Sequence, residues 1–259
     1  MSFKKAAFAL LALTVLAGTS AKADIKIGVA AEPYPPFTSK DASGQWVGWE
    51  IDVANAVCAS MHEKCAIMET AWDGTIPALN AKKFDMIAAS MAVTPKRKEV
   101  IDFSDIYYQS AAVMVGAKNG DMDISPKHLA GKIIGVQIST IHAAYLDKYF
   151  AKTSSIKTYQ TQDEANQDLS AGRIDYVLAN GMALDDFLKS DPNSCCESKA
   201  AVPYDADIFG PGVGFGLRKG EADLAAKLNA AIKTVNADGT LEKITAKFGL
   251  TGKIELPAK

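Results

Sequence analysis

Short apolar runs alternate with segments of helical periodicity along most of the chain. Runs of strand length occupy residues 25–29, 86–89, 111–115, 133–137 and 176–178. Between them, apolar residues recur every three or four positions in segments that begin near Ile51, Thr75, Pro95, Thr140, Glu164 and Gly181. This alternation predicts an α/β protein with parallel sheets covered on both faces by helices.

The last fifth of the chain departs from this alternation. Two helices are predicted at 221–237 and 241–248, separated by the turn Ala237-Asp238-Gly239. The glycine-rich run at 212–216 lacks the G-x-G-x-x-G spacing of a dinucleotide site, and no helix follows it directly. We therefore expect a glycine-rich strand there, near a crossing between lobes.

The first 23 residues have the pattern of a secretory signal peptide. Lys4 and Lys5 precede an apolar run at 6–17, and Ala21-Lys22-Ala23 forms a small-x-small cleavage site. Its removal leaves 25 basic and 30 acidic residues, a formal charge of −5, so nucleic acid is not an expected partner. The remaining chain, 48% hydrophobic over the full sequence, is long enough for one large domain or two small lobes.

The four cysteines form two pairs of different character. In one continuous helix the Cα atoms of Cys58 and Cys65 would be roughly 10.5 Å apart, too far for a disulfide, so we expect the helix to end between them and a disulfide to form. The state of the neighbouring Cys195 and Cys196 stays open. Neither pair has zinc-site spacing and the three histidines are far apart in sequence, so we expect no metal and no cofactor.

Two helix starts carry the candidate chemistry. Thr94-Pro95 predicts an N-cap and a first helical residue, which places Arg97 in the first turn, where a cation is unfavourable unless it holds an anion. A second start, at Ser139 or Thr140, offers free N–H groups to an anion. Anion binding has an alternative at each helix start: residues 96–98 could be a solvated basic turn, and residues 139–140 an ordinary helix cap.

Several short motifs, taken in order, resemble those of periplasmic solute-binding proteins of polar amino-acid transporters, particularly the lysine/arginine/ornithine, histidine and octopine/nopaline group. They are spread over the whole mature chain: Tyr34-Pro35-Pro36-Phe37, the VCASMHEKC segment, Trp72-Asp73-Gly74 with Ile76-Pro77, Val93-Thr94-Pro95-Lys96-Arg97, Asp102-Phe103-Ser104, Ala171-Gly172-Arg173-Ile174-Asp175, Gly216-Leu217-Arg218-Lys219 and Asp238-Gly239-Thr240.

This resemblance implies the two-lobed type II periplasmic binding protein fold, in which two α/β lobes are joined by two crossing strands and the ligand lies in the cleft. We expect a signal peptide at 1–23, lobe 1 at 24–109 and 207–259, and lobe 2 at 110–206. The implied function is capture of a small molecule in the periplasm by a monomer that delivers it to the membrane permease of an ATP-binding cassette (ABC) importer.

The resemblance also implies which residues contact the ligand. Arg97 would bind an α-carboxylate, helped by backbone N–H groups near Ser90 and Ala92 and by Ser139-Thr140 from the other lobe. Tyr34 and Trp72 would enclose the ligand side chain, and Glu32 would meet a basic end. The full expected set is Glu32, Tyr34, Trp72, Ala89, Ser90, Ala92, Arg97, Ser139, Thr140, His142 and Asn180.

Three positions depart from the pattern of this group. Asn180 stands where a carboxylate usually meets the ligand α-ammonium, Ala92 where a serine often stands, and Ile138 where a glycine often precedes Ser139. Loss of that charge favours an opine such as octopine or nopaline, whose second carboxylate could use Asn180, His142 or nearby N–H groups. Arginine, ornithine, lysine and histidine remain open.

An enzyme is the alternative function, because the same fold hosts dehydratases of the cyclohexadienyl dehydratase type. An acid–base enzyme needs cleft carboxylates with separated pKa values. The nearest acid pairs, Asp102/Asp105 and Asp185/Asp186, fall in a turn and on an exposed helix face, and the sequence has no G-x-S-x-G or H-E-x-x-H motif. We therefore expect a binding protein and not an enzyme.

Overall fold

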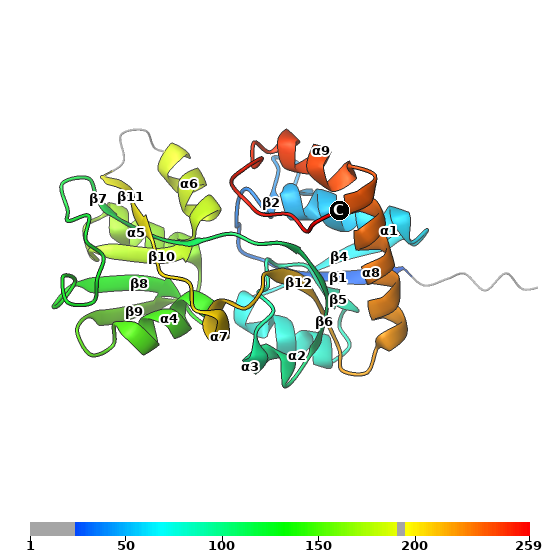
Figure 1. The fold of residues 1–259 in the computed structure, drawn as a ribbon, viewed down its shortest axis with the longest axis horizontal. Coiled ribbons are helices and arrows are strands. Elements are labelled where there is room, and N and C mark those ends of the chain that lie inside the picture. Colours follow the sequence, from blue (N-terminus) through cyan, green and yellow to red (C-terminus); the bar gives the residue numbers. More distant parts are fainter. Residues whose placement is uncertain (1–23, 191–194) are drawn as a thin grey trace, which may run out of the picture.

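The computed structural model describes residues 24–190 and 195–259, so the predicted signal peptide lies outside the described residues. Two five-stranded sheets, each with its own helices, form two lobes, with lobe 1 at the right of Figure 1 and lobe 2 at the left. This confirms the two-lobed α/β fold.

The sheet of lobe 1 has the strand order β4-β1-β5-β12-β6. Its strands are β1 (Ile25–Ala30), β4 (Cys65–Thr70), β5 (Met86–Ile87), β6 (Asp102–Tyr108) and β12 (Val213–Leu217). Successive residues of β5 point to opposite faces, so Met86 joins the larger apolar cluster and Ile87 the smaller one. Helices α1 (Trp49–Ser60), α8 (Ala222–Ala237) and α9 (Thr240–Lys247) cover the first face, and α2 (Thr75–Asn80) covers the second.

The sheet of lobe 2 has the order β11-β7-β10-β8-β9. Its strands are β7 (Ala112–Ala117), β8 (Ile133–Gln137), β9 (Ser155–Tyr159), β10 (Tyr176–Asn180) and β11 (Cys196–Ala201). Helix α4 (Ile141–Tyr149) packs on one face, and α5 (Gln162–Ser170) and α6 (Gly181–Ser190) pack on the other. Five short elements complete the assignment: the hairpin strands β2 (Ser39–Lys40) and β3 (Trp46–Val47), the one-turn helix η1 (Trp72–Gly74), and the helices α3 (Pro95–Lys98) and α7 (Ala206–Phe209).

The expectation of parallel sheets is only partly correct. β1 pairs parallel with β4 and β5, and β8 pairs parallel with β9 and β10, but β12 is antiparallel to β5 and β6, and β7 is antiparallel to β10 and β11. The reason is the connection between lobes: the chain leaves lobe 1 after β6 and returns before β12, so these neighbouring strands run in opposite directions. The glycine-rich run at 212–216 is indeed a strand, β12, beside this crossing.

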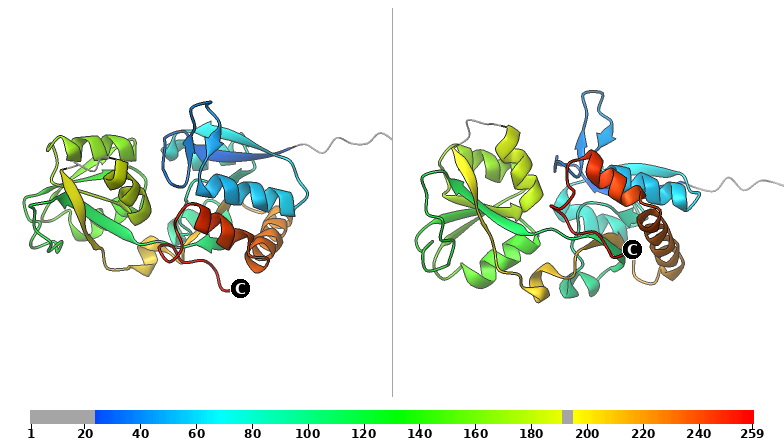
Figure 2. Two further views of the ribbon diagram at one scale, coloured as in Figure 1. Left: turned by 90° about the horizontal axis from the view of Figure 1, so that it is seen from above. Right: turned by 45° about the horizontal axis from the view of Figure 1, so that its top comes forward.

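Two crossings join the lobes, at residues 109–111 and 202–212, and the C-terminal segment returns to them (Figure 2). The N–H and carbonyl groups of Gln109 and Glu255 exchange hydrogen bonds of 2.8 Å. We propose lobe boundaries in these crossings, with residues 24–109 and 207–259 in lobe 1 and 110–206 in lobe 2.

The predicted disulfide is present. α1 ends at Ser60, His62 takes a positive φ of 54° in the turn that follows, and Cys65 opens β4 beside Cys58, with a Cα–Cα distance of 6.3 Å. Cys195 and Cys196, whose state the sequence left open, are bonded to each other.

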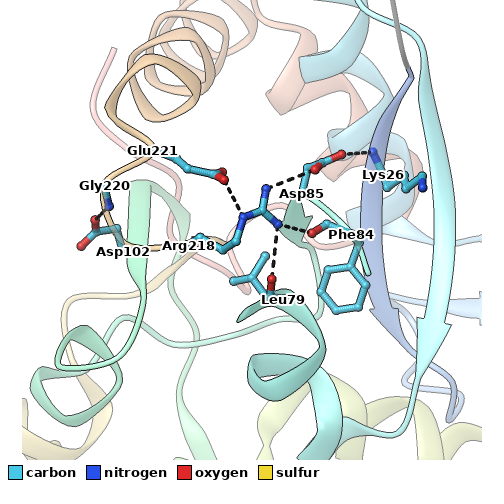
Figure 3. A network of polar contacts seen from close by, with 8 residues as sticks. All are labelled: Lys26, Leu79, Phe84, Asp85, Asp102, Arg218, Gly220 and Glu221. Carbon is cyan, nitrogen blue, oxygen red and sulfur yellow. Dashed lines mark hydrogen bonds and ion pairs between the residues drawn. The ribbon is translucent and has the colours of Figure 1, made fainter. Parts of the chain in front are cut away.

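Arg218, from the Gly216-Leu217-Arg218-Lys219 motif, forms hydrogen bonds and ion pairs with several segments at one end of the lobe 1 sheet (Figure 3). Its guanidinium pairs with Glu221 at 2.5 Å and Asp85 at 3.2 Å, and donates to the carbonyls of Leu79 and Phe84. The other oxygen of Asp85 accepts the N–H of Lys26 at 2.9 Å. This motif is structural and lies outside the cavity described below.

No helix in the described ranges has both the length and the apolar character needed to cross a membrane.

Candidate functional site

A cavity of about 410 Å³ lies between the lobes and is bounded by both crossings. Ten of the eleven expected ligand-binding residues line it: Glu32, Tyr34, Trp72, Ala89, Ser90, Ala92, Arg97, Thr140, His142 and Asn180. Ser139 is not in the lining, although its carbonyl oxygen contacts Arg97. The structure thus brings residues that are up to 148 positions apart in sequence, from Glu32 to Asn180, to one enclosed space.

Arg97 turns into this cavity from α3. Thr94 is the predicted N-cap, and its Oγ1 accepts the N–H of Arg97 at 3.2 Å. The guanidinium donates to the carbonyls of Ala92 at 2.9 Å and Ser139 at 3.2 Å, and its carbon lies 5.4 Å from the centre of the Trp72 ring. Lys96 and Lys98 are exposed, so the three basic residues do not form a uniformly solvated turn.

The charge of Arg97 is not neutralised by an acid within the described residues, where no ion pair involves it. Its donors reach only main-chain carbonyls, and burial lowers its pKa to about 10, which still leaves it charged at neutral pH. A desolvated guanidinium with free donors favours an anionic ligand group, above all a planar carboxylate.

Trp72 contacts a second charged group, Glu32, in addition to Arg97. The Trp72 N–H donates to Glu32 Oε1 at 3.0 Å, and its indole Nε1 donates across the cleft to the carbonyl of Ile138 at 3.1 Å. The other oxygen, Glu32 Oε2, is buried and has no hydrogen-bond partner within the described residues. Burying a carboxylate oxygen without a donor costs free energy, and a ligand with a cation or an N–H group near this atom would remove that cost.

Tyr34 and Asn180 meet across the cleft. The Tyr34 hydroxyl lies against the backbone of Asn180, and burial raises the pKa of Tyr34 far above its ordinary value, so the phenol is neutral. The Asn180 side chain donates to Ser110 Oγ at 2.6 Å and accepts the N–H of Met182 at 2.9 Å, at the start of α6. Its amide can offer the cavity one remaining N–H and one remaining lone pair, but no charge.

The second predicted helix start lies opposite Arg97. Thr140 is the N-cap of α4: its Oγ1 accepts the N–H of Ala143 at 3.0 Å and donates to the carbonyl of Gln137 at 2.8 Å. The N–H groups of Ile141 and His142, the first two helical residues, have no acceptor within the helix. Burial, aided by the charge of Arg97, lowers the pKa of His142 to about 3, so a neutral imidazole faces the cavity.

Ser90 differs from the expectation that its N–H would help to bind a carboxylate. That N–H donates to both carboxylate oxygens of Glu50, at 2.9 and 2.8 Å, and the Ser90 hydroxyl donates to Glu50 Oε2 at 2.8 Å. Glu50 is fully buried in the first turn of α1 and was missed in the sequence. Its only signal there is an acid between Trp49 and Ile51 on the apolar face of a helix, which does not reveal the partner 40 residues away.

Sequence reasoning also missed eight polar lining residues, which no local pattern marks because only the topology brings them to the cleft. Gln109, Ser110 and Tyr204 come from the crossings, Lys253 and Glu255 from the C-terminal segment, and Thr38, Gln137 and Gln162 from the lobes.

Within the described ranges, no cluster of three or more histidine, cysteine or acidic residues is arranged to hold a metal ion. The expected residues that line the cavity supply a cation, a carboxylate, two aromatic rings and neutral hydrogen-bonding groups, and the exposed Lys253 and Glu255 add one charge of each sign from the C-terminal segment.

The chain is similar to known proteins over most of its length. The model for bacterial extracellular solute-binding proteins, family 3, matches residues 25–251. The chain is 37% identical to the L-arginine-binding protein of Pseudomonas aeruginosa over 95% of its own length and 96% of that protein. Among solved structures, an ancestral arginine-binding protein bound to arginine superposes with a TM-score of 0.81 at 32% identity, covering 88% of this chain and 98% of that one.

A third similar structure is an ancestral amino acid-binding protein described as a precursor of cyclohexadienyl dehydratase, with a TM-score of 0.76 at 30% identity, covering 87% of this chain and 94% of that one. The family model spans nearly all of the described chain, and relatives above 30% identity cover it almost end to end. The chain therefore belongs to family 3 of the bacterial extracellular solute-binding proteins.

Proposed function

We propose that this protein is the substrate-binding component of an ABC importer and that it captures a basic amino acid, or an opine conjugate of one, between its lobes. The observation that carries the proposal is a pair of charged groups, both in contact with Trp72, that lack a partner of opposite charge among the described residues. Arg97 has no acid among the described residues, and Glu32 Oε2 has no donor. A ligand with a carboxylate at one end and a cation at the other would satisfy both.

Contacts between the lobes explain how such a ligand would be enclosed. Arg97 and Trp72 of lobe 1 donate to the carbonyls of Ser139 and Ile138 in lobe 2. The carboxylate would lie between Arg97 and the free N–H groups at the start of α4, so that it binds both lobes at once. The closed form would then dock on a membrane permease whose cytoplasmic ATPase supplies the energy.

Two ligand classes fit this cavity. Arginine, ornithine, lysine or histidine would place the α-carboxylate on Arg97 and the basic side chain towards Glu32. Asn180 favours the second class, the opines, because no carboxylate stands there for a primary ammonium, and the polar crossing residues Gln109 and Ser110 extend the lining beyond it. Octopine or nopaline would place its additional carboxylate in that region.

Isothermal titration calorimetry on refolded mature protein tests the proposal. The panel comprises arginine, ornithine, lysine, histidine, octopine and nopaline, with glutamine as the uncharged control. Binding of a basic member with micromolar or better affinity supports the proposal, and preference for an opine over its parent amino acid selects the second class. Absence of binding to every basic member would refute the proposal.

We further propose that the protein acts without catalysis, in the periplasm and as a monomer. The carboxylates in the described lining are Glu32 and Glu255, and Glu255 is exposed on the C-terminal segment, so no close acid pair is available for acid–base chemistry. Incubation with prephenate or arogenate should give no product. Mass spectrometry of the exported protein should give an N-terminus at Asp24, and light scattering should give the mass of one chain.

A further inference from the structure

A buried carboxylate that does not line the cavity lies directly behind it. Glu50 is fully buried, and three donor groups converge on its two oxygens: the N–H and hydroxyl of Ser90 and the hydroxyl of Tyr107. Burial raises the pKa of Glu50, and these hydrogen bonds oppose that rise. Hydrogen bonds donated to a carboxylate stabilise its charged form, so these three donor groups favour an ionised Glu50.

Glu50 determines what Ser90 can offer to a ligand. Ser90 is in the left-handed region with φ of 50°, an uncommon conformation for a residue with a side chain, and both of its donors point to Glu50. The hydroxyl proton is therefore used, and only the oxygen lone pairs of Ser90 remain for the cavity that it lines. Ser90 is an acceptor on this wall.

The charge of Glu50 has no nearby cation to offset it. Its partners are neutral, and no ion pair to it occurs within the described residues. Its field reaches the cavity, because the charge of Glu50 adds to the effect of burial in raising the pKa of Tyr34, which lines the wall. A cation bound near Ser90 would gain from this field, which low polarity around Glu50 screens weakly.

The position of Ser90 matches one group of an α-amino acid. The ammonium and carboxylate of such a ligand are separated by one carbon, so the ammonium must lie beside whatever holds the carboxylate. Ser90 and Arg97 line the same cavity, and the guanidinium donates to the carbonyl of Ala92, two residues after Ser90. We infer that Glu50 is a positioning residue that supplies, through the Ser90 hydroxyl, the negative charge for the ligand α-ammonium. This inference rests on the proposed function, the binding of a basic amino acid.

The test compares arginine with guanidinovalerate, which is arginine without its α-amino group, in calorimetric titrations of the wild type and Glu50→Gln. Replacing the charged acceptor by a neutral one should weaken the affinity for arginine by about tenfold, whereas the affinity for guanidinovalerate should change by less than about twofold. Asp52→Asn is the matched control: it removes one charge from the same helix, at a surface pair with Lys247 outside the cavity, and should change neither affinity.

Two further measurements separate positioning from a purely structural effect. Glu50→Asp, which restores the charge on a shorter arm, should recover part of the arginine affinity. The amide proton of Ser90 should move upfield in the NMR spectrum of Glu50→Gln, and should not move in Asp52→Asn.

Equal losses for arginine and guanidinovalerate, or an unchanged Ser90 amide, would overturn the inference while leaving the proposed function in place. A wild-type protein that binds no basic amino acid would instead refute the proposed function, and with it this inference, which rests on it.

Discussion

Two arginines of this chain allow ligand binding and stability to be separated. Arg97 and Arg218 are both partly buried and both donate to two main-chain carbonyls, but only Arg218 also pairs with acids, Asp85 and Glu221. We predict that Arg97→Ala abolishes ligand binding with little effect on folding, and that Arg218→Ala has the reverse effect.

The size of the Arg97 effect follows from opposing contributions. The fall of its pKa from 12.5 to about 10 corresponds to roughly 3 kcal/mol against the charged form in the folded protein. Its two hydrogen bonds contribute about 1.5 kcal/mol each, so Arg97→Ala should change the free energy of unfolding of the ligand-free protein by less than about 1 kcal/mol. Loss of the carboxylate partner should weaken ligand binding by about a thousandfold, or roughly 4 kcal/mol.

Removal of Arg218 leaves two carbonyls and two carboxylates without their donor. Breaking one partially buried network of this kind costs about 3 kcal/mol, which lowers the melting temperature by roughly 6–12 °C for a chain of this length. The ligand-binding affinity should be unchanged, because Arg218 does not line the cavity.

Calorimetric titration and thermal unfolding of both variants, with and without 1 mM arginine or octopine, check the prediction. The wild-type protein should melt at a higher temperature with ligand, and so should Arg218→Ala, from its lower starting point. A ligand-induced rise in Arg97→Ala as large as that of the wild type would refute our account of the site. A large loss of stability in ligand-free Arg97→Ala would show that Arg97 is structural.

Three further predictions concern the disulfide, Glu32 and His142. Replacing Cys58 and Cys65 by alanine should lower the free energy of unfolding by about 2.5 kcal/mol in denaturant titrations and leave ligand affinity unchanged, because the ring is short and distant from the cleft. Glu32→Gln should weaken the affinity for arginine by about tenfold and leave the affinity for glutamine unchanged in parallel titrations, since only arginine brings a cation to that side chain. The pKa of His142 is about 3 in the folded state and 6.5 in the unfolded state, so its contribution to stability is present above pH 6.5 and is lost as the pH falls, by at most about 1.4 kcal/mol per pH unit. In His142→Phe, the free energy of unfolding should therefore depend less steeply on pH between pH 6.5 and 4. An unchanged slope of unfolding free energy against pH would contradict the burial of His142 as a neutral ring.

The strands that could be predicted are those inside the sheets. β1, β5, β12, β7, β10 and β8 all have a neighbour on each side, and each was expected from an apolar run or, for β12, from its glycines. In the two large sheets, the strands that were missed, β4, β6, β9 and β11, are the four edge strands; the short hairpin strands β2 and β3 were missed as well. An interior strand is buried on both faces and shows a continuous apolar run, whereas an edge strand such as β9 has no buried residue and no such run.

The candidate site divides in a similar way. Arg97, Thr94 and Thr140 could be identified because their signals are local: an N-cap, a proline at the first helical position and a cation in the wrong turn. Glu50 and Gln109 could not, because each acts through a partner or a surface supplied by a segment far away in the sequence. The expected role of the Ser90 N–H differed from the structure for the same reason, since only the fold shows that a buried acid already accepts it.

The charges around the cavity bear on which ligand class it takes. With Glu50 acting through Ser90, the cavity offers one positive group, Arg97, and two negative groups, Glu50 and Glu32. Arginine carries the complementary set, one carboxylate with two cations, the α-ammonium and the guanidinium. On this arrangement Asn180 need not carry a charge, and a plain basic amino acid is matched without a conjugate. Octopine brings a fourth charge, a second carboxylate, which must find its donors among His142, Asn180 and the crossings. Competition between arginine and octopine for the site therefore measures whether those groups suffice.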